Sequence, residues 1–370
     1  MTRRFDVCIR GHGVVGRALA LLLARERLQV ALVAPPPAHP TVPDVRAYAL
    51  NQKSKTLLES LRCWPEPEQA TAVTQMQVMG DQGGELNFKA DSLHNPSLTW
   101  IVDVPALLAQ LDEALRYQPQ IELFEDAPAA ELTVVCEGRA SSTRAEFGAD
   151  FAVTPYPQQA IATRLRCQYP HAQTAHQWFS QNEILAFLPL GGPPGNSVAV
   201  VWSVQTERVA QLLNSSPTDF CHALELASHH RLGQLKLDSE RVAWPLQKAS
   251  ANRWSGKQEG AAWVLAGDAA HNLHPLAGQG LNLGLADVAE LAKLIAQRDY
   301  WRSVADEKLL RRYERTRKTD VAAMQIVTDG LQLLFSKEGS GWESMRNLGM
   351  KGVEHSPAIK QWMVRQALGI

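Results

Sequence analysis

The residues best suited to chemistry lie in residues 266–284, which read AGDAAHNLHPLAGQGLNLG. This stretch follows a short apolar run, residues 261–266, that predicts a buried strand, and it passes into helical spacing from about Leu281. A glycine-rich loop between a strand and a helix offers free backbone amides, close backbone approach and the positive end of a helix dipole. Such a loop suits a phosphorylated or polyol-bearing cofactor. The short carboxylate of Asp268, just past the strand, could accept hydrogen bonds from the hydroxyl groups of a polyol.

A second group of glycines lies near the start of the chain, in residues 11–16 (GHGVVG). Residues 5–10 before it predict a strand, residues 18–28 after it have the apolar spacing of a helix, and residues 29–34 predict a second strand. This is the Gly-x-Gly-x-x-Gly fingerprint of a dinucleotide-binding β-α-β unit. In order, its three glycines would serve the tight turn, the approach of the pyrophosphate and the packing of the helix on the strand.

Together the two segments resemble the flavin-dependent aromatic hydroxylases, and in particular their ubiquinone-biosynthesis branch, whose members hydroxylate polyprenylated phenols. Three further stretches are similar to that branch. They are residues 44–50 (DVRAYAL), residues 134–144 (VVCEGRASSTR), and a tail that includes residues 312–315 (RYER) and 328–331 (TDGL). The resemblance covers nearly the whole chain and is most specific at residues 266–284 and in the tail.

The resemblance implies an FAD-dependent monooxygenase that hydroxylates an apolar aromatic ring of a ubiquinone precursor. NAD(P)H would be the co-substrate and O2 the oxidant, acting through a flavin C4a-hydroperoxide. Pro275, Gly278 and Gly280 would form the catalytic loop beside the reactive edge of the flavin, where loop amides stabilise negative charge. Asp268 would bind the ribityl chain, and Arg46 the pyrophosphate or ribityl region. The cofactor-binding residues expected on this basis are Gly11, Gly13, Val14, Val15, Gly16, Arg46, Gly138, Gly267, Asp268, Pro275, Gly278, Gln279, Gly280, Leu281 and Asn282.

Four departures from the family pattern bear on the cofactor. The family usually places an acidic residue at the end of the second strand, where this chain has Ala34. Glu137 replaces the usual Asp before Gly138, and Asp103-Val104 replaces a frequent Glu-Asn pair. Residues 121–132 are too short for the usual hairpin. These changes predict a weakened adenosine end of the FAD site.

Two other functions remain open. One is a non-hydroxylating FAD oxidoreductase of the same fold, which oxygen consumption coupled to hydroxylation would distinguish. The other is a weakly flavin-binding accessory protein of quinone biosynthesis, which the flavin spectrum of the purified protein would distinguish. A generic NAD-binding Rossmann site is disfavoured because residues 266–284 suit a flavin. His271 and His274 are spaced as metal ligands can be, but their loop position favours structural or flavin-adjacent roles, so we expect no metal.

The composition is that of a globular enzyme. The chain has 370 residues, 45% hydrophobic and 20% charged, which is enough to bury a large core. A net charge of −1 gives no electrostatic footprint for nucleic acid. Five scattered cysteines, the absence of an apolar leader and the lack of a spanning apolar run predict a cytoplasmic protein with reduced thiols. A basic run at residues 311–318 leaves open a peripheral contact with a membrane or a quinone-biosynthesis complex; a homo-oligomer also remains open.

The pattern predicts an α/β fold with a Rossmann-like FAD-binding domain, an interleaved mixed β-sheet substrate domain and C-terminal helices. The FAD-binding domain would take residues 1–70, 97–155 and 250–300, and the substrate domain residues 71–96 and 156–249. The C-terminal helical segment would take residues 301–370. Strands are expected at residues 161–167, 174–179, 184–189, 197–204 and 242–246, a hairpin at 75–90, and helices at 206–235, 304–335 and 359–367.

The missing acidic residue generates a first prediction. In Ala34→Glu, a carboxylate at the end of the second strand would supply the acceptor that the ribose lacks. FAD affinity should rise by about 1.5–3 kcal/mol, the value of one charge-assisted hydrogen bond. Titration of apo-protein with FAD measures it. Nanomolar binding by the wild type with no gain in the variant would mean that another group already holds the ribose.

Overall fold

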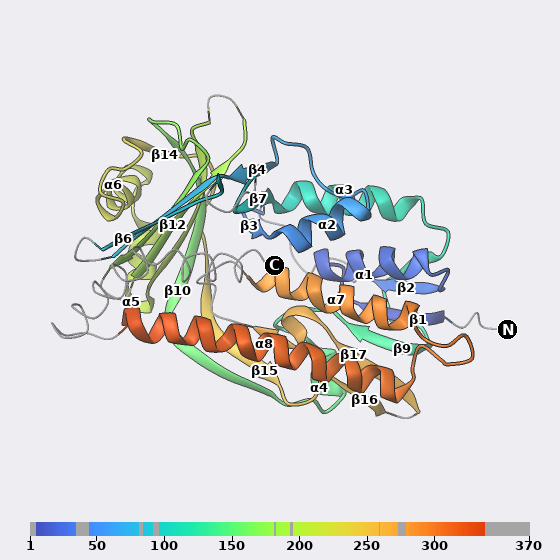
Figure 1. Cartoon of the computed structure of the whole chain (residues 1–370). Coiled ribbons are helices and arrows are strands. Elements are labelled where there is room, and N and C mark those ends of the chain that lie inside the picture. The colour runs from blue at the N-terminus through green and yellow to red at the C-terminus, as the bar shows by residue number, and fades with distance from the viewer. Residues whose placement is uncertain are drawn as a thin grey trace.

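A computed structural model of the chain describes residues 5–34, 44–80, 84–91, 96–180, 183–192, 195–258, 260–272 and 279–336, with the backbone alone over 326–336. The architecture is the expected α/β fold with two large sheets (Figure 1). The predicted helix at residues 359–367 lies outside the described residues.

A six-stranded sheet forms one half of the molecule. Its strand order is β16 (Ser255–Gln258), β17 (Ala261–Leu265), β9 (Ala130–Val135), β1 (Phe5–Arg10), β2 (Val30–Val33) and β8 (Ile121–Phe124). All neighbours are parallel except β16 and β17. Because β9 pairs in parallel with both β1 and β17, the two glycine-rich segments leave the strands on either side of β9 at the same edge of the sheet.

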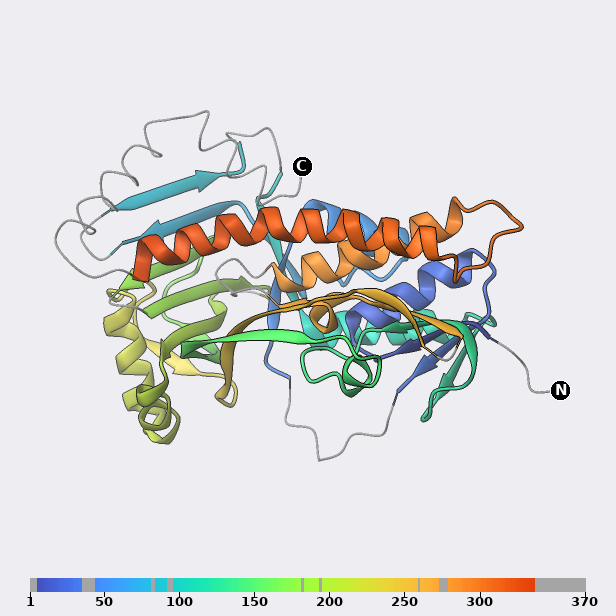
Figure 2. The same cartoon turned by 90° about the horizontal axis from the view of Figure 1, so that it is seen from below.

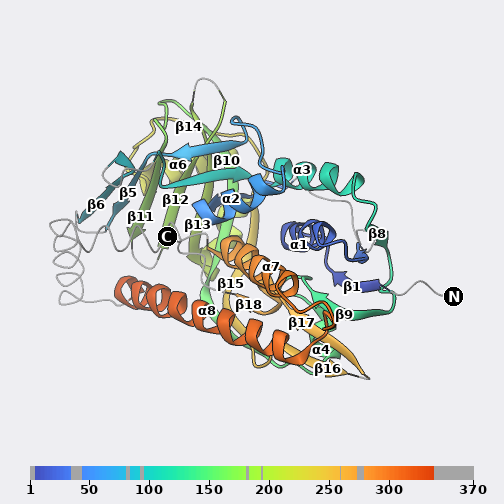
Figure 3. The ribbon, with the colours of Figure 1, turned by 45° about the vertical axis from the view of Figure 1, so that its right-hand side comes forward.

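Helices cover this sheet. On one face, α1 (Val14–Arg25) packs against both α3 (Val104–Arg116) and α7 (Gly280–Ala296) (Figure 3). The shared core joins strand residues such as Val7, Ile9 and Leu32 to helix residues such as Leu19 and Val288, all fully buried. The long helix α8 (Glu307–Ser336) packs on α7 and β16 and runs along the length of the molecule (Figure 2). Short α4 (Ser142–Glu146) follows β9.

A nine-stranded sheet forms the other half. Its path is β18 (His271–Asn272), β15 (Val242–Ala251), β10 (Phe151–Cys167), β13 (Ser197–Gln205), β12 (Glu183–Leu190), β11 (Thr174–Ser180), β5 (Gln75–Met79) and β6 (Glu85–Lys89), with β14 (Leu235–Leu237) paired to β10. The predicted hairpin is confirmed as β5 and β6. Helices α5 (Thr206–Asn214) and α6 (Pro217–Ala227) pack against the sheet through a core that includes Trp202 and Phe220.

Two sequence expectations needed correction. The strand expected from Ile161 begins at Phe151, and its partner continues to Ala251, so β10 and β15 pair over a long stretch with a register shift between Pro155 and Gln159. The helix expected over residues 206–235 is instead two helices, α5 and α6, because the backbone is extended at Ser215 and Ser216. Helix does not continue beyond α6, because His229 and His230 both have positive φ angles, which a helix cannot accommodate. The proposed domain boundaries near residues 155 and 249 fall within β10 and β15, and this division stays a prediction.

A three-stranded antiparallel sheet lies between the two halves (Figure 1). Its order is β3 (Ala47–Leu50), β7 (Thr99–Asp103) and β4 (Ala70–Val73), and α2 (Gln52–Ser60) follows β3 directly. Small and apolar side chains such as Ala47, Ile101 and Ala199 pack it against the nine-stranded sheet.

Candidate functional site

The N-terminal glycines differ sharply in the space around them. A Cβ on Gly11 would lie 2.3 Å from the carbonyl oxygen of Cys136, and one on Gly16 would lie 1.9 Å from that of Gly11. The φ angle of Gly11 is also positive, at +123°. At Gly13 a Cβ would meet no atom within 4 Å. Two glycines therefore allow close packing, whereas the middle one opens onto unfilled space, as a bound pyrophosphate requires.

The start of α1 is suited to an anion. Gly13 is its N-cap and provides no side-chain cap, and no acidic residue lies in the first turn. The first amides of a helix lack intrahelical partners and carry the positive end of the dipole. This helix end can therefore bind a phosphate group through its backbone.

The turn after β17 lies directly against this helix. Gly267 has a φ angle of +62°, and a Cβ there would lie 3.5 Å from the methyl groups of Val15. A Cβ on Gly284, one turn into α7, would lie 2.8 Å from Val15 Cγ2. The structure thus brings the two segments predicted from sequence together at Val15, Gly267 and Gly284.

Asp268 occupies the centre of that turn, in a short 3-10 helix (Gly267–Ala269). A Cβ on Gly280, the first residue of α7, would lie 3.9 Å from its Oδ1. Burial raises the pKa of Asp268, against the opposing effects of His271, Arg139 and Arg46. No residue of the described part of the chain donates a hydrogen bond to its carboxylate, so both oxygens can accept from a ligand.

Arg46 lies at the same site but already has a partner. Its guanidinium binds Asp44 through two nitrogens, Nε to Oδ1 at 2.8 Å and Nη2 to Oδ2 at 2.6 Å. Burial alone would raise the pKa of Asp44, but the hydrogen bonds from Arg46 lower it below its usual value. Nη1 of Arg46 also donates to the Tyr48 hydroxyl at 3.4 Å. Asp44 therefore fixes the orientation of Arg46 at the mouth of the site.

The predicted residues at the start of α7 are used structurally. The Asn282 Oδ1 atom accepts from the Asn51 amide at 2.9 Å and from the Ser54 hydroxyl at 2.7 Å, and its Nδ2 donates to Ala49 O at 2.8 Å. Leu281 is partly buried and packs against the core. The Asn282 side chain fastens α7 to α2 and β3, so a ligand can meet only the backbone of Asn282. Pro275 and Gly278 lie outside the described residues, and their roles stay predictions.

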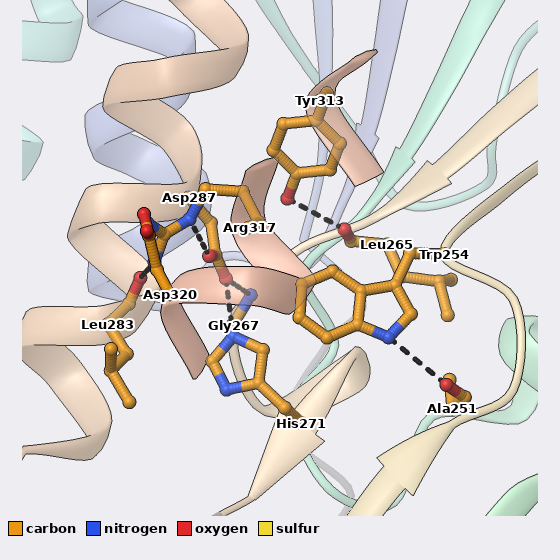
Figure 4. A network of polar contacts seen from close by, with 10 residues as sticks. All are labelled: Ala251, Trp254, Leu265, Gly267, His271, Leu283, Asp287, Tyr313, Arg317 and Asp320. Carbon is orange, nitrogen blue, oxygen red and sulfur yellow. Dashed lines mark hydrogen bonds and ion pairs between the residues drawn. The ribbon is translucent and has the colours of Figure 1, made fainter. Parts of the chain in front are cut away.

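A buried ionic network that the sequence did not predict holds the Asp268 turn in place (Figure 4). The Asp287 carboxylate accepts from the Gly267 amide at 2.8 Å, from His271 Nε2 at 2.7 Å and from Arg317 Nε at 2.7 Å. Burial would raise the pKa of Asp287, but His271 and Arg317 outweigh it and lower the pKa below its usual value. One carboxylate on α7 therefore connects the turn, β18 and α8. The only sequence signal was an acidic residue within the apolar pattern of a helix.

Glu137 and Asp103, two residues that differ from the family pattern, also have structural roles. Glu137 accepts from Arg10 Nε at 3.1 Å, Ser141 Oγ at 2.7 Å and Thr143 Oγ1 at 2.6 Å. It thereby shapes the turn around Gly138, whose φ angle is +80° and whose Cβ position is open. Asp103 caps α3 by accepting from Ala106 N at 3.0 Å. Neither replacement leaves an unpaired charge beside the site.

The described residues contain neither a metal-binding cluster nor a membrane-spanning helix. Histidine, cysteine and acidic side chains form no group of three that could hold a metal ion. No helix there is long and apolar enough to cross a membrane.

Comparison with known proteins agrees with this geometry. Residues 125–328 match the family model described as "FAD binding domain". The chain belongs to the FAD binding domain family. It is 29% identical to the 3-demethoxyubiquinol 3-hydroxylase of Escherichia coli K12, over 99% of this chain and 98% of that protein. It is 26% identical to the mitochondrial ubiquinone biosynthesis monooxygenase COQ6 of Drosophila melanogaster, over 100% of this chain and 90% of that protein.

The fold is shared with solved monooxygenases. The p-nitrophenol 4-monooxygenase PnpA of Pseudomonas putida superposes with a TM-score of 0.75 over 100% of this chain and 99% of that one, at 16% identity. The residues present fit FAD, because the open Cβ position at Gly13, the uncapped start of α1 and the free Asp268 carboxylate match its phosphate and polyol groups.

Gly13 should be essential for the cofactor and dispensable for the fold. In Gly13→Val the side chain fills the space meant for the pyrophosphate, so FAD binding should be lost while the melting temperature of the apo-protein changes little. Titration of apo-protein with FAD measures binding. The matched control is His12→Ala, which should retain affinity within a few-fold. Equal losses in both variants would contradict this role of the glycine.

Asp268→Ala should weaken FAD binding without unfolding the protein. The change removes a charged acceptor for ligand hydroxyls, worth about 1.5–3 kcal/mol, or roughly 10- to 150-fold in Kd. Asp299→Ala, an exposed carboxylate beyond α7, is the control and should bind FAD normally. Unchanged flavin content in Asp268→Ala would reject the assignment.

Asp287→Asn should destabilise the whole fold. It removes the buried carboxylate partner of the Arg317 guanidinium, which keeps only the exposed Asp320 (Nη1 to Oδ2, 2.6 Å), and we expect a loss of about 3–5 kcal/mol in the free energy of unfolding. Urea denaturation of the apo-protein measures it, with Glu290→Gln on the same helix as the control. A loss below about 1 kcal/mol would show that the network is not a major source of stability.

Proposed function

We propose that this protein is a flavin-dependent monooxygenase that hydroxylates an apolar aromatic ring of a ubiquinone precursor, with NAD(P)H and O2 as co-substrates. The observation that carries the proposal is the meeting of an uncapped helix end and a free, half-buried carboxylate at Val15, Gly267 and Asp268. The named activities of the full-length relatives supply the substrate class.

Different parts of the chain would bind different groups of the cofactor. The α1 N-terminus would bind the pyrophosphate through backbone amides, and Asp268 would accept from the ribityl hydroxyls. Arg46, held by Asp44, would add positive charge at the mouth of the site. When bound, FAD would couple the oxidation of NAD(P)H to the insertion of one oxygen atom of O2 into the ring.

The start of α7 would contribute electrostatically. Its N-cap, Gln279, provides no side-chain cap, so the first amides of the helix remain available. Gly280 adds no side chain there, and it lies beside Asp268. These amides would stabilise negative charge that develops on the ligand next to them.

We also propose that the protein is cytoplasmic and meets its apolar substrate at a membrane surface. Tyr300 and Trp301, in the connection between α7 and α8, are 91% and 68% exposed and contact each other edge to face. Such aromatic residues favour the interface between membrane and water. The partner of the reaction is then a small apolar aromatic molecule rather than nucleic acid.

Purified protein tests the function directly. The expected result is a flavin spectrum, NAD(P)H oxidation stimulated by a prenylated phenol, and a product heavier by one oxygen atom, with 18O incorporated from 18O2. NAD(P)H oxidation with an unhydroxylated product would favour another FAD oxidoreductase. Protein that binds no flavin on titration would favour an accessory role.

A further inference from the structure

We infer that Arg17 and Asp112 form a positioning pair that aims the backbone amide of Gly13 at the pyrophosphate of FAD. Neither side chain would touch the cofactor. Arg17 would act through the carbonyl group of His12, and Asp112 would act through Arg17. The inference concerns how tightly the cofactor is held, and it does not depend on which reaction the bound flavin then performs.

The guanidinium of Arg17 connects the glycine loop to α3. Its Nε donates to Asp112 Oδ1 at 2.7 Å and its Nη2 to Asp112 Oδ2 at 3.1 Å, a two-point geometry that fixes a guanidinium in one orientation. Its Nη1 donates to the carbonyl oxygen of His12. The side chain of Arg17 is only 9% exposed, so little water competes for these hydrogen bonds.

The hydrogen bond to His12 determines where the next amide points. In a trans peptide the C=O and N–H groups point to opposite sides of the chain. Because the His12 carbonyl points at Arg17, the amide of Gly13 points away from Arg17. The side-chain position of Gly13 is open, and no described residue accepts a hydrogen bond from its amide. That amide is therefore available to a phosphate oxygen.

The main chain of Arg17 fixes the peptide group on the other side of Gly13. The Arg17 amide donates to the Gly13 carbonyl oxygen at 3.0 Å, which begins the hydrogen-bond pattern of α1. One residue therefore holds both peptide groups that flank Gly13, one through its side chain and the other through its backbone.

The charges also indicate a role in orientation. Arg17 lies in the first turn of α1, where the helix dipole disfavours a cation, and the Asp112 carboxylate offsets this cost. The ring of His12 adds no charge at neutral pH, because burial and the nearby Arg17 lower its pKa below the usual value. The pair then has no net charge, so it offers a phosphate group little direct attraction.

Asp112→Ala separates orientation from charge. Removing the carboxylate leaves one more positive charge near the phosphate site, so an effect of charge alone would strengthen FAD binding. An effect on orientation would weaken it, because Arg17 is then free to leave the His12 carbonyl. We expect the Kd for FAD, measured by titration of apo-protein, to rise at least fivefold. An unchanged or smaller Kd, or a wild type that binds no FAD, would overturn the inference.

Arg17→Met removes the other member of the pair and should raise the Kd for FAD at least tenfold. The matched control is Arg25→Met at the other end of α1, because Arg25 also donates to a backbone carbonyl group, that of Ser60. The control should bind FAD within twofold of the wild type. Because Asp112 acts through Arg17, the double variant should bind FAD as weakly as Arg17→Met alone. Additive losses, or equal losses in Arg17→Met and the control, would contradict this role.

Phosphorus NMR distinguishes positioning from a purely structural role. A purely structural pair would lower the melting temperature of the apo-protein and leave FAD affinity and the 31P signals of bound FAD unchanged, which would overturn the inference. We expect the pyrophosphate signals to shift in both variants of the pair and to match the wild type in Arg25→Met. If Arg17→Met does not fold, Asp112→Ala decides, because the Asp112 side chain is 42% exposed and alanine favours a helix. These results in a protein that shows no hydroxylation would refute the proposed function but not the pair.

Discussion

The buried carboxylate of Asp287 is the interaction on which the rest of the site depends. Its two oxygens accept from a backbone amide, an imidazole and a guanidinium, which come from the turn after β17, from β18 and from α8. Removing a carboxylate from water is costly unless it is fully paired, and here all its partners are charged or strongly polar. The turn that presents Asp268 is therefore fixed by a group that does not itself face the ligand.

Neighbouring acidic residues of the site therefore have different roles: some bind protein groups, and one keeps its oxygens for a ligand. Asp268 lies in the turn and Asp287 lies on α7 against it, and the pKa values of the two carboxyl groups shift in opposite directions. Asp287 accepts directly from the Arg317 guanidinium and the His271 imidazole, which lower its pKa. Asp268 has no such donor among the described residues, so its acceptor capacity is kept for a ligand. The same division occurs at the mouth of the site, where Asp44 is used to orient Arg46.

The sequence predicted the parts of the fold that local patterns encode. The strand, glycine turn and helix of residues 5–28 follow from spacing alone, and so does the segment from β17 to α7. The Asp287 network was missed because its partners are contributed by residues 267, 271 and 317, which only the tertiary fold brings together. The start of β10 was missed because Pro155 and Pro157 argue against a strand, yet both lie at its register shift. Asn282 was expected at the cofactor, and nothing local showed that its amide would be used to fasten α2.

The strand order of the six-stranded sheet has a consequence for synthesis of the chain. β1, made first, pairs with β9 about 125 residues later, and β9 obtains its second neighbour only when β17 is made, about 130 residues after that. Until then the nascent chain exposes the apolar edge of β9, because β17 does not yet pair with Leu132, Val134 and Val135. The nucleotide-binding half therefore cannot close during translation until most of the chain has left the ribosome, and the unfinished sheet needs protection from pairing with other chains.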